Sequence, residues 1–133
     1  MNIKMNISNH NSYLLVNRGF LRQNAQTVIS RLGRVTSLIP VLKDDAYGLG
    51  LVPVAQALCD NPAIRTIAVA HVSEGLELRE AGIDREVLVM GGALPFQMEA
   101  AVEAGLTLAC GHAGFLYNEE LAAVGASRAG VCH

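Results

Sequence analysis

Short apolar runs alternate with amphipathic stretches along most of the chain. The runs are four or five residues long and mostly apolar, as expected for strands of a sheet that is covered on both faces. Between them, apolar positions recur every three or four residues, which is typical of one face of a helix; Leu21, Ala25, Val28 and Leu32 are an example. The expected strands are Tyr13–Val16, Leu38–Leu42, Thr66–Ala70, Glu86–Met90 and Leu106–Cys110.

Helix signals separate these runs. Pro53 stands near the start of the second helix, where the fixed φ of proline favours the first turn. Ser73 is placed to cap the helix that follows the third run. Pro40 gives no N–H to a ladder, so it must occupy a strand position whose N–H is not needed. The expected helices cover residues 21–32, 53–59, 74–81, 95–104 and 114–124.

The strand–helix rhythm predicts an α/β fold with a parallel sheet. The strands start roughly 20 to 30 residues apart, which is the length of a βαβ unit. Two architectures fit this rhythm, an open doubly wound sheet and a (β/α)8 barrel. A complete barrel needs eight units and about 250 residues. The chain has 133 residues and about four core βα units, so as a barrel it would hold half of one.

Composition and charge narrow the class of protein. Hydrophobic residues make up 51% and charged residues 17%, which allows a packed core. The net charge is −2 with no basic stripe, which argues against a nucleic-acid partner, and no apolar run approaches the ~20 residues that span a bilayer. The polar stretch Met1–Ser12 lacks the apolar core of a signal peptide, so we expect a cytoplasmic protein. The chain has three cysteines, Cys59, Cys110 and Cys132. Their odd number and irregular spacing are not those of a disulfide framework.

Lys43 is the candidate for chemistry. It is one of two lysines, and it directly follows an apolar run at the end of a predicted strand, where α/β folds place their active sites. Partial burial would lower its pKa and free the amine to attack an aldehyde. Tyr47 offers a phenolic O–H, while Gly48 and Gly50 permit close approach of a ligand. Spacing alone leaves an ordinary surface lysine as an equal alternative.

Other polar residues near strand ends have simpler interpretations. His71, Cys110 and His112 follow strands at the same edge, but they lack the paired spacing of metal ligands, so we expect no metal site. The acidic residues of the helix after the third run are interpreted as a solvated face: Glu74, Glu77 and Glu80.

The octet from Lys43 to Gly50, Lys-Asp-Asp-Ala-Tyr-Gly-Leu-Gly, resembles the cofactor-lysine signature of the alanine racemases. The resemblance extends from about Tyr13 to Val124 and includes the stretches 67–70, 74–83 and 87–92. Related pyridoxal-phosphate barrels share a strand-end lysine but not the Ala-Tyr-Gly. Asp44 and Asp45 stand where the family commonly has Ala-Asn, and Leu49 where a histidine is common.

This resemblance implies a fold type III enzyme, with a (β/α)8 barrel, a C-terminal β domain and a head-to-tail homodimer. Residues 1–12 would form a polar tail. Residues 13–133 would form the N-terminal half of the barrel domain, about four βα units of a partial TIM-like barrel, without the β domain. The resemblance makes Lys43 the lysine that forms a Schiff base with pyridoxal 5'-phosphate and one of two catalytic bases. It places Tyr47 and Met90 at the cofactor.

The implied reaction is racemisation of L-alanine to D-alanine, which supplies D-alanine for bacterial cell-wall synthesis. In the family, the second base, an arginine facing the cofactor ring and the main phosphate loop lie beyond the position of His133. We therefore expect the 133 residues to be inactive by themselves. Two alternatives stay open: a non-catalytic pyridoxal-phosphate-binding (homeostasis) module of the same barrel superfamily, and a truncated, inactive fragment. The sequence does not distinguish alanine from serine or a broader substrate range.

Overall fold

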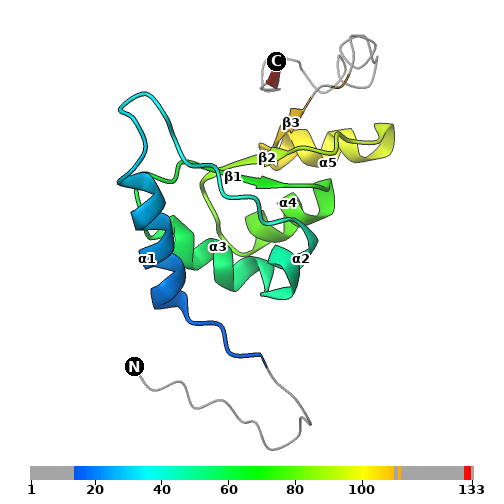
Figure 1. Cartoon of the computed structure of the whole chain (residues 1–133). Coiled ribbons are helices and arrows are strands. Elements are labelled where there is room, and N and C mark those ends of the chain that lie inside the picture. The colour runs from blue at the N-terminus through cyan, green and yellow to red at the C-terminus, as the bar shows by residue number, and fades with distance from the viewer. Residues whose placement is uncertain (1–13, 110, 112–130, 133) are drawn as a thin grey trace, which may run out of the picture.

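A parallel sheet forms the centre of the molecule. The computed structural model describes residues 14–109, 111 and 131–132 (Figure 1). Four strands pair in sequential order, and every pair is parallel. They are β1 (Thr66–Val69), β2 (Glu86–Val89), β3 (Thr107–Ala109) and β4 (Val131–Cys132). The expected tail 1–12 and the expected helix 114–124 lie outside the described residues.

The strand order distinguishes between the two architectures that fitted the sequence. Ala68 of β1 pairs with Leu88 of β2, and Val41 bridges to Ala68 on the other side of β1. The order is therefore the Val41 segment, β1, β2, β3 and β4, without a reversal. A doubly wound sheet reverses its strand order at a switch point, whereas a barrel adds each strand on the same side. The fold is α/β with parallel strands, part of a barrel.

Helices lie between the strands in the sequence. In Figure 1, α1, α3 and α4 lie on one side of the strands. Asn17 begins α1, since its side-chain oxygen accepts the N–H groups of Gly19 and Phe20 at 2.9 and 3.2 Å. The helical elements are α1 (Arg18–Ile29), α2 (Lys43–Gly48), α3 (Leu51–Cys59), α4 (Val72–Glu80), the 3-10 turn η1 (Pro95–Gln97) and α5 (Met98–Glu103).

The core is aliphatic, as a chain without tryptophan requires. In β1 the three residues Ile67, Ala68 and Val69 are all buried, and in β2 Val87 and Val89 are buried. Leu51 and Val54 of α3 and Leu78 of α4 pack in the same cluster. The buried sheet therefore provides a rigid base for residues that follow its strands.

Two of the expected strands differ in the structure. The prediction for Tyr13–Val16 was wrong: residues 14–16 form no strand, and Leu14 and Leu15 are exposed. Of Leu38–Leu42, only the bridge at Val41 forms. Pro40 fits there because it contributes its carbonyl, which accepts the N–H of Ala68 at 2.8 Å, and no N–H is needed from it.

Three helix predictions were also inaccurate. The buried side of α1 carries Ala25 and the half-buried Ile29, whereas Val28 is exposed. The N-cap of α4 is His71 and not Ser73, because α4 begins two residues earlier than its apolar pattern indicated. The helix expected over 95–104 divides into η1 and α5.

Candidate functional site

Lys43 follows the edge segment that pairs with β1. The N–H of Leu42 donates to the carbonyl of Ala68 at 2.8 Å, so the chain is fixed up to the residue before the lysine. Leu42 is buried, while the Lys43 side chain is 41% exposed. Because the segment runs parallel to β1, the lysine lies at the carboxyl end of the sheet, as predicted. A fixed backbone and an accessible amine are what a residue needs to hold a carbonyl compound covalently.

A left-handed turn begins directly after the lysine. Residues Asp44 to Tyr47 have φ between 52° and 58° and ψ between 37° and 52°, values of the left-handed helix. Ala46 is buried in this turn, and its N–H donates to the carbonyl of Leu42 at 2.9 Å. Gly48 and Gly50 also have positive φ, a conformation that glycine adopts without steric penalty. The turn reverses the chain tightly enough for α3 to start at Leu51.

Asp44 and Asp45 have different surroundings. An Asp45 carboxylate oxygen accepts the N–H of Leu51, the first residue of α3, at 2.7 Å. Negative charge at a helix N-terminus is favourable, so Asp45 stabilises the start of α3. Asp44 is mostly exposed, and its Oδ2 lies 3.9 Å from the Lys43 Nζ. One carboxylate thus supports the fold and the other faces the lysine.

Glu74 is not part of a solvated face, which corrects the prediction from the sequence. Its Oε1 accepts the N–H of Asp44 at 2.6 Å. Its Oε2 accepts the N–H groups of Ala70 and His71 at 2.9 and 3.0 Å. Glu77 and Glu80 are exposed, as expected. An acidic residue three positions after the N-cap is the one sequence signal that indicates this role, because such residues reach back to the cap.

Tyr47 and Met90 lie near the same edge. The Tyr47 side chain is exposed, and Met90 is 41% exposed although Val89 before it is fully buried. The N–H of Met90 donates to the carbonyl of Val69 at 2.9 Å, so Met90 is at the carboxyl end of β2. Neighbouring strands lie about 4.8 Å apart, and β1 lies between the segment that leads to Lys43 and the strand that leads to Met90. These two segments are therefore roughly 10 Å apart. The three predicted cofactor residues are thus accessible at one end of the sheet.

Gly91 packs against the end of β1. Its N–H donates to the Ala70 carbonyl at 3.0 Å, and a Cβ on Gly91 would lie 2.5 Å from that oxygen. Only glycine fits this approach without a shift of the backbone. Gly91 and His71 also line a small pocket at the carboxyl ends of the strands. The other residues that line this pocket are Gly92, Ala93, Leu94, Gln97, Ala109 and Gly111. Cys110 and His112 lie outside the described residues, within which no three metal-ligating side chains gather.

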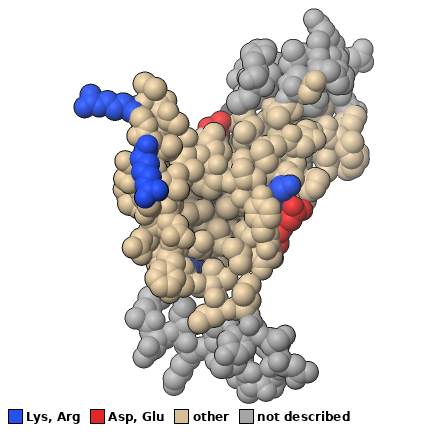
Figure 2. Space-filling view, in the orientation of Figure 1, with Lys and Arg blue, Asp and Glu red and all other residues tan. Residues whose placement is uncertain are grey.

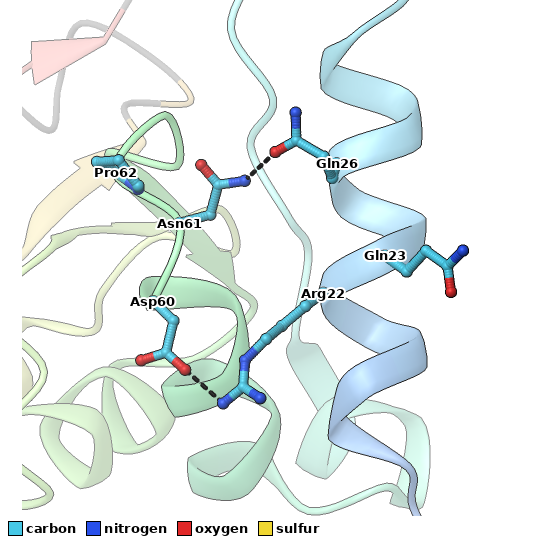
Figure 3. A pocket seen from close by; sticks show the side chains of 6 residues that line it. All are labelled: Arg22, Gln23, Gln26, Asp60, Asn61 and Pro62. Atoms are coloured by element: carbon cyan, nitrogen blue, oxygen red, sulfur yellow. Dashed lines mark hydrogen bonds and ion pairs between the residues drawn. The ribbon is translucent and has the colours of Figure 1, made fainter.

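A larger pocket lies between α1 and the turn after α3. Figure 3 shows Arg22 of α1 reaching to Asp60, with which it forms an ion pair, and Asn61 donating to the side chain of Gln26 at 2.8 Å. Gln23 points away from this pair. The turn precedes β1, so this pocket is on the side opposite the lysine, where barrels place stabilising contacts. Four of its polar side chains pair with each other, Arg22 with Asp60 and Asn61 with Gln26, and we assign the pocket a structural role.

Charge is spread thinly over one face of the molecule. In Figure 2, the visible face carries scattered acidic and basic side chains and no single charged patch. None of the helices in the described part of the chain has the length and apolar character needed to cross a membrane.

Comparisons with known proteins show the family to which the chain is related. The family model described as "Alanine racemase, N-terminal domain" matches residues 16–131. An alanine racemase of Geobacter sulfurreducens is 37% identical over 89 residues, which are 67% of this chain and 23% of the relative. One from Streptococcus pyogenes serotype M5 is 37% identical over 93 residues, 70% of this chain and 25% of the relative. The chain spans about a quarter of these relatives.

Solved structures give the same result. Alanine racemase from Clostridium difficile 630 superposes with a TM-score of 0.74 and 29% identity, over 86% of this chain and 30% of that chain. Alanine racemase from Bacillus anthracis with bound L-Ala-P superposes with a TM-score of 0.65 and 30% identity, over 70% of this chain and 24% of that chain. The arrangement of strands and helices described above is therefore that of the barrel domain in these enzymes.

Proposed function

The chain belongs to the family of alanine racemase N-terminal domains, and from this premise we propose that it provides the cofactor lysine of a pyridoxal-phosphate-dependent alanine racemase. The single observation that carries the proposal is the position of Lys43. Its backbone is fixed by the pairing with β1, its side chain is accessible, and it is at the end of the sheet where barrel enzymes hold their substrates.

The residues at this edge fit the cofactor. An accessible primary amine binds the aldehyde of pyridoxal phosphate, and Tyr47 and Met90 provide a phenol and an apolar side chain at the same end of the sheet. Bound there, the cofactor supplies an electron sink for the carbanion left when an amino acid loses its α-proton. Lys43 also acts as one of the two bases: its Nζ takes or returns that proton on one face of the α-carbon. The Asp44 Oδ2 lies 3.9 Å from this Nζ, at the same end of the sheet.

Reductive trapping tests the proposal directly. The protein is incubated with pyridoxal phosphate, reduced with borohydride and digested, and the label is located by mass spectrometry. The chain has only two lysines, so Lys4→Arg is a matched control for Lys43→Arg. We expect label at Lys43 in the parent and in Lys4→Arg, and its loss in Lys43→Arg. A parent protein that carries no label at Lys43, or equal label at Lys4, contradicts the proposal.

Substrate, assembly and location are parts of the same proposal. We propose L- and D-alanine as substrates, a homodimer as the active form and the cytoplasm as its location. The Ala-Tyr-Gly after the lysine favours a racemase over a non-catalytic cofactor-binding module. Reading the gene past His133 separates them: a further β domain with a tyrosine base supports the racemase, and a barrel that closes without one supports the binding module.

A further inference from the structure

The parallel ladder between the lysine segment and β1 stops at Lys43, and a carboxylate takes its place. Up to that point the pairing is regular: the Ala68 N–H donates to Pro40, and the Leu42 N–H donates to Ala68. If the ladder continued, the N–H of Ala70 would donate to the carbonyl of Leu42, and the N–H of Asp44 would donate to the carbonyl of Ala70. Both of these N–H groups donate to Glu74 instead.

The carbonyls of the interrupted ladder also have new partners. The Leu42 carbonyl accepts the N–H of Ala46 inside the left-handed turn, at 2.9 Å. The Ala70 carbonyl accepts the N–H of Gly91 from the other side of β1, at 3.0 Å. Glu74 is therefore the connection that remains between the residue after Lys43 and the end of β1. Hydrogen bonds to a carboxylate are stronger than those between neutral groups, so one side chain is sufficient for this connection.

We propose that Glu74 is a positioning residue for Lys43: its carboxylate, bound to the N–H groups of Asp44, Ala70 and His71, holds the lysine at the end of the sheet. This inference rests on the proposed function only for what Lys43 does there. Glu74 acts through the backbone, without contact to the cofactor or the substrate. Glu74→Gln keeps the size of the side chain but replaces one acceptor oxygen with a donor, so at least one of the three N–H groups loses its partner.

Amide hydrogen exchange of the whole chain, without cofactor, measures this connection. We expect Glu74→Gln to speed exchange by about tenfold or more at one or more of the amides of Asp44, Ala70 and His71, and to leave the β2 amides of Val87 and Val89 unchanged. Glu77→Gln is the matched control, since Glu77 is on the same helix and its side chain is exposed. It should leave all five amides at their parental rates.

Trapping with pyridoxal phosphate and borohydride provides the second measurement. We expect Lys43 to be labelled several-fold more slowly in Glu74→Gln than in the parent or in Glu77→Gln. The inference is overturned if Glu74→Gln exchanges the three amides at parental rates, or if Val87 and Val89 accelerate equally, which would make Glu74 a general stabilising residue. It is also overturned if any of the three amides accelerates while labelling stays at the parental rate.

Two further results keep the test decisive. If Glu74→Gln does not fold, the parent alone is measured: slow exchange of the Asp44 amide, whose acceptor is Glu74, supports the inference, and exchange at the unfolded rate overturns it. A parent that is not labelled at Lys43 contradicts the proposed function, and then the exchange result alone decides whether Glu74 holds this backbone.

Discussion

Arg79 of α4 provides the sharpest prediction about stability. Its guanidinium donates to four carbonyls: Nε to Ala104 at 2.8 Å, Nη1 to Ile83 and Arg85 at 2.6 and 2.8 Å, and Nη2 to Gly105 at 3.1 Å. These carbonyls belong to the loops that precede β2 and β3. One side chain therefore fixes the start of two strands, at the end of the sheet opposite Lys43.

The expected loss follows from the number of bonds. A hydrogen bond contributes about 1 kcal/mol net, and more when the donor is charged. Arg79 is half-buried, so we take the lower value for each of its bonds and expect Arg79→Met to lose about 3–4 kcal/mol of unfolding free energy. Arg79→Lys retains the charge but not the planar fork, so about half of that loss is expected. A loss of this size is a large part of the ~5–15 kcal/mol of a typical domain.

Urea unfolding followed by circular dichroism measures the change. Arg31→Met is the control, because Arg31 is exposed at the end of α1 and the substitution is the same. Its midpoint should stay near that of the parent. If Arg79→Met unfolds within 1 kcal/mol, roughly one hydrogen bond, of Arg31→Met, the four bonds do not stabilise the fold as argued. Labelling of the folded fraction at Lys43 should be unaffected, because the site is at the other end.

Four further outcomes are expected. Gly91→Ala should destabilise the protein by about 1–3 kcal/mol in the same urea assay, because its Cβ would lie 2.5 Å from the Ala70 carbonyl, whereas Gly33→Ala, with only a contact at 4.0 Å, should not. Asp45→Ala should lose about 1 kcal/mol by removing the acceptor for Leu51, and Asp45→Asn should retain most of it. Burial raises the pKa of the Cys59 thiol, and this effect outweighs the lowering by Arg85. At pH 8 a smaller fraction of Cys59 is therefore thiolate than in a free cysteine. Peptide mapping should show that Cys59 is alkylated more slowly than a free cysteine, and faster as the pH rises. The 133 residues alone should bind pyridoxal phosphate at Lys43 but show no racemisation, since Lys43 provides a base for one face of the α-carbon only; measurable turnover, free of contaminating enzyme, would refute this.

The sequence predicted the elements that depend on buried apolar runs. The strands at Thr66 and Glu86 and the helix ending at Cys59 agree with prediction, because periodicity reports directly on burial. The run at Tyr13–Val16 failed for the same reason: it is apolar, but residues 14–16 have no partner strand in the described structure, and Leu14 and Leu15 remain exposed. Apolar character indicates that a segment is able to form a strand, and only tertiary pairing decides whether it does.

The position of the proposed cofactor lysine was predictable from the sequence, and the residues that hold its backbone were less so. The place of Lys43 at the carboxyl end of the sheet was predicted because this residue directly follows an apolar run. The position of Glu74 was not, since its role depends on a hydrogen bond to Asp44, thirty residues away in the sequence. Helix periodicity placed Glu74 with Glu77 and Glu80, but only Glu74 lies in the first turn of α4, where it reaches back to the end of β1.

The left-handed turn explains why these supporting residues gather around Lys43. Each non-glycine residue in that conformation is disfavoured by roughly 1–2 kcal/mol, so four in succession, from Asp44 to Tyr47, persist only if their surroundings hold them. Glu74 binds the first residue of the turn, Asp45 ties the second to the start of α3, and the third, Ala46, is buried. A strand continuing through Lys43 would extend the ladder past the lysine, whereas the turn ends the ladder there and leads directly into α3. The backbone around Lys43 is therefore specified by contacts from β1, α3 and α4 together, and the octet from Lys43 to Gly50 by itself could not indicate them.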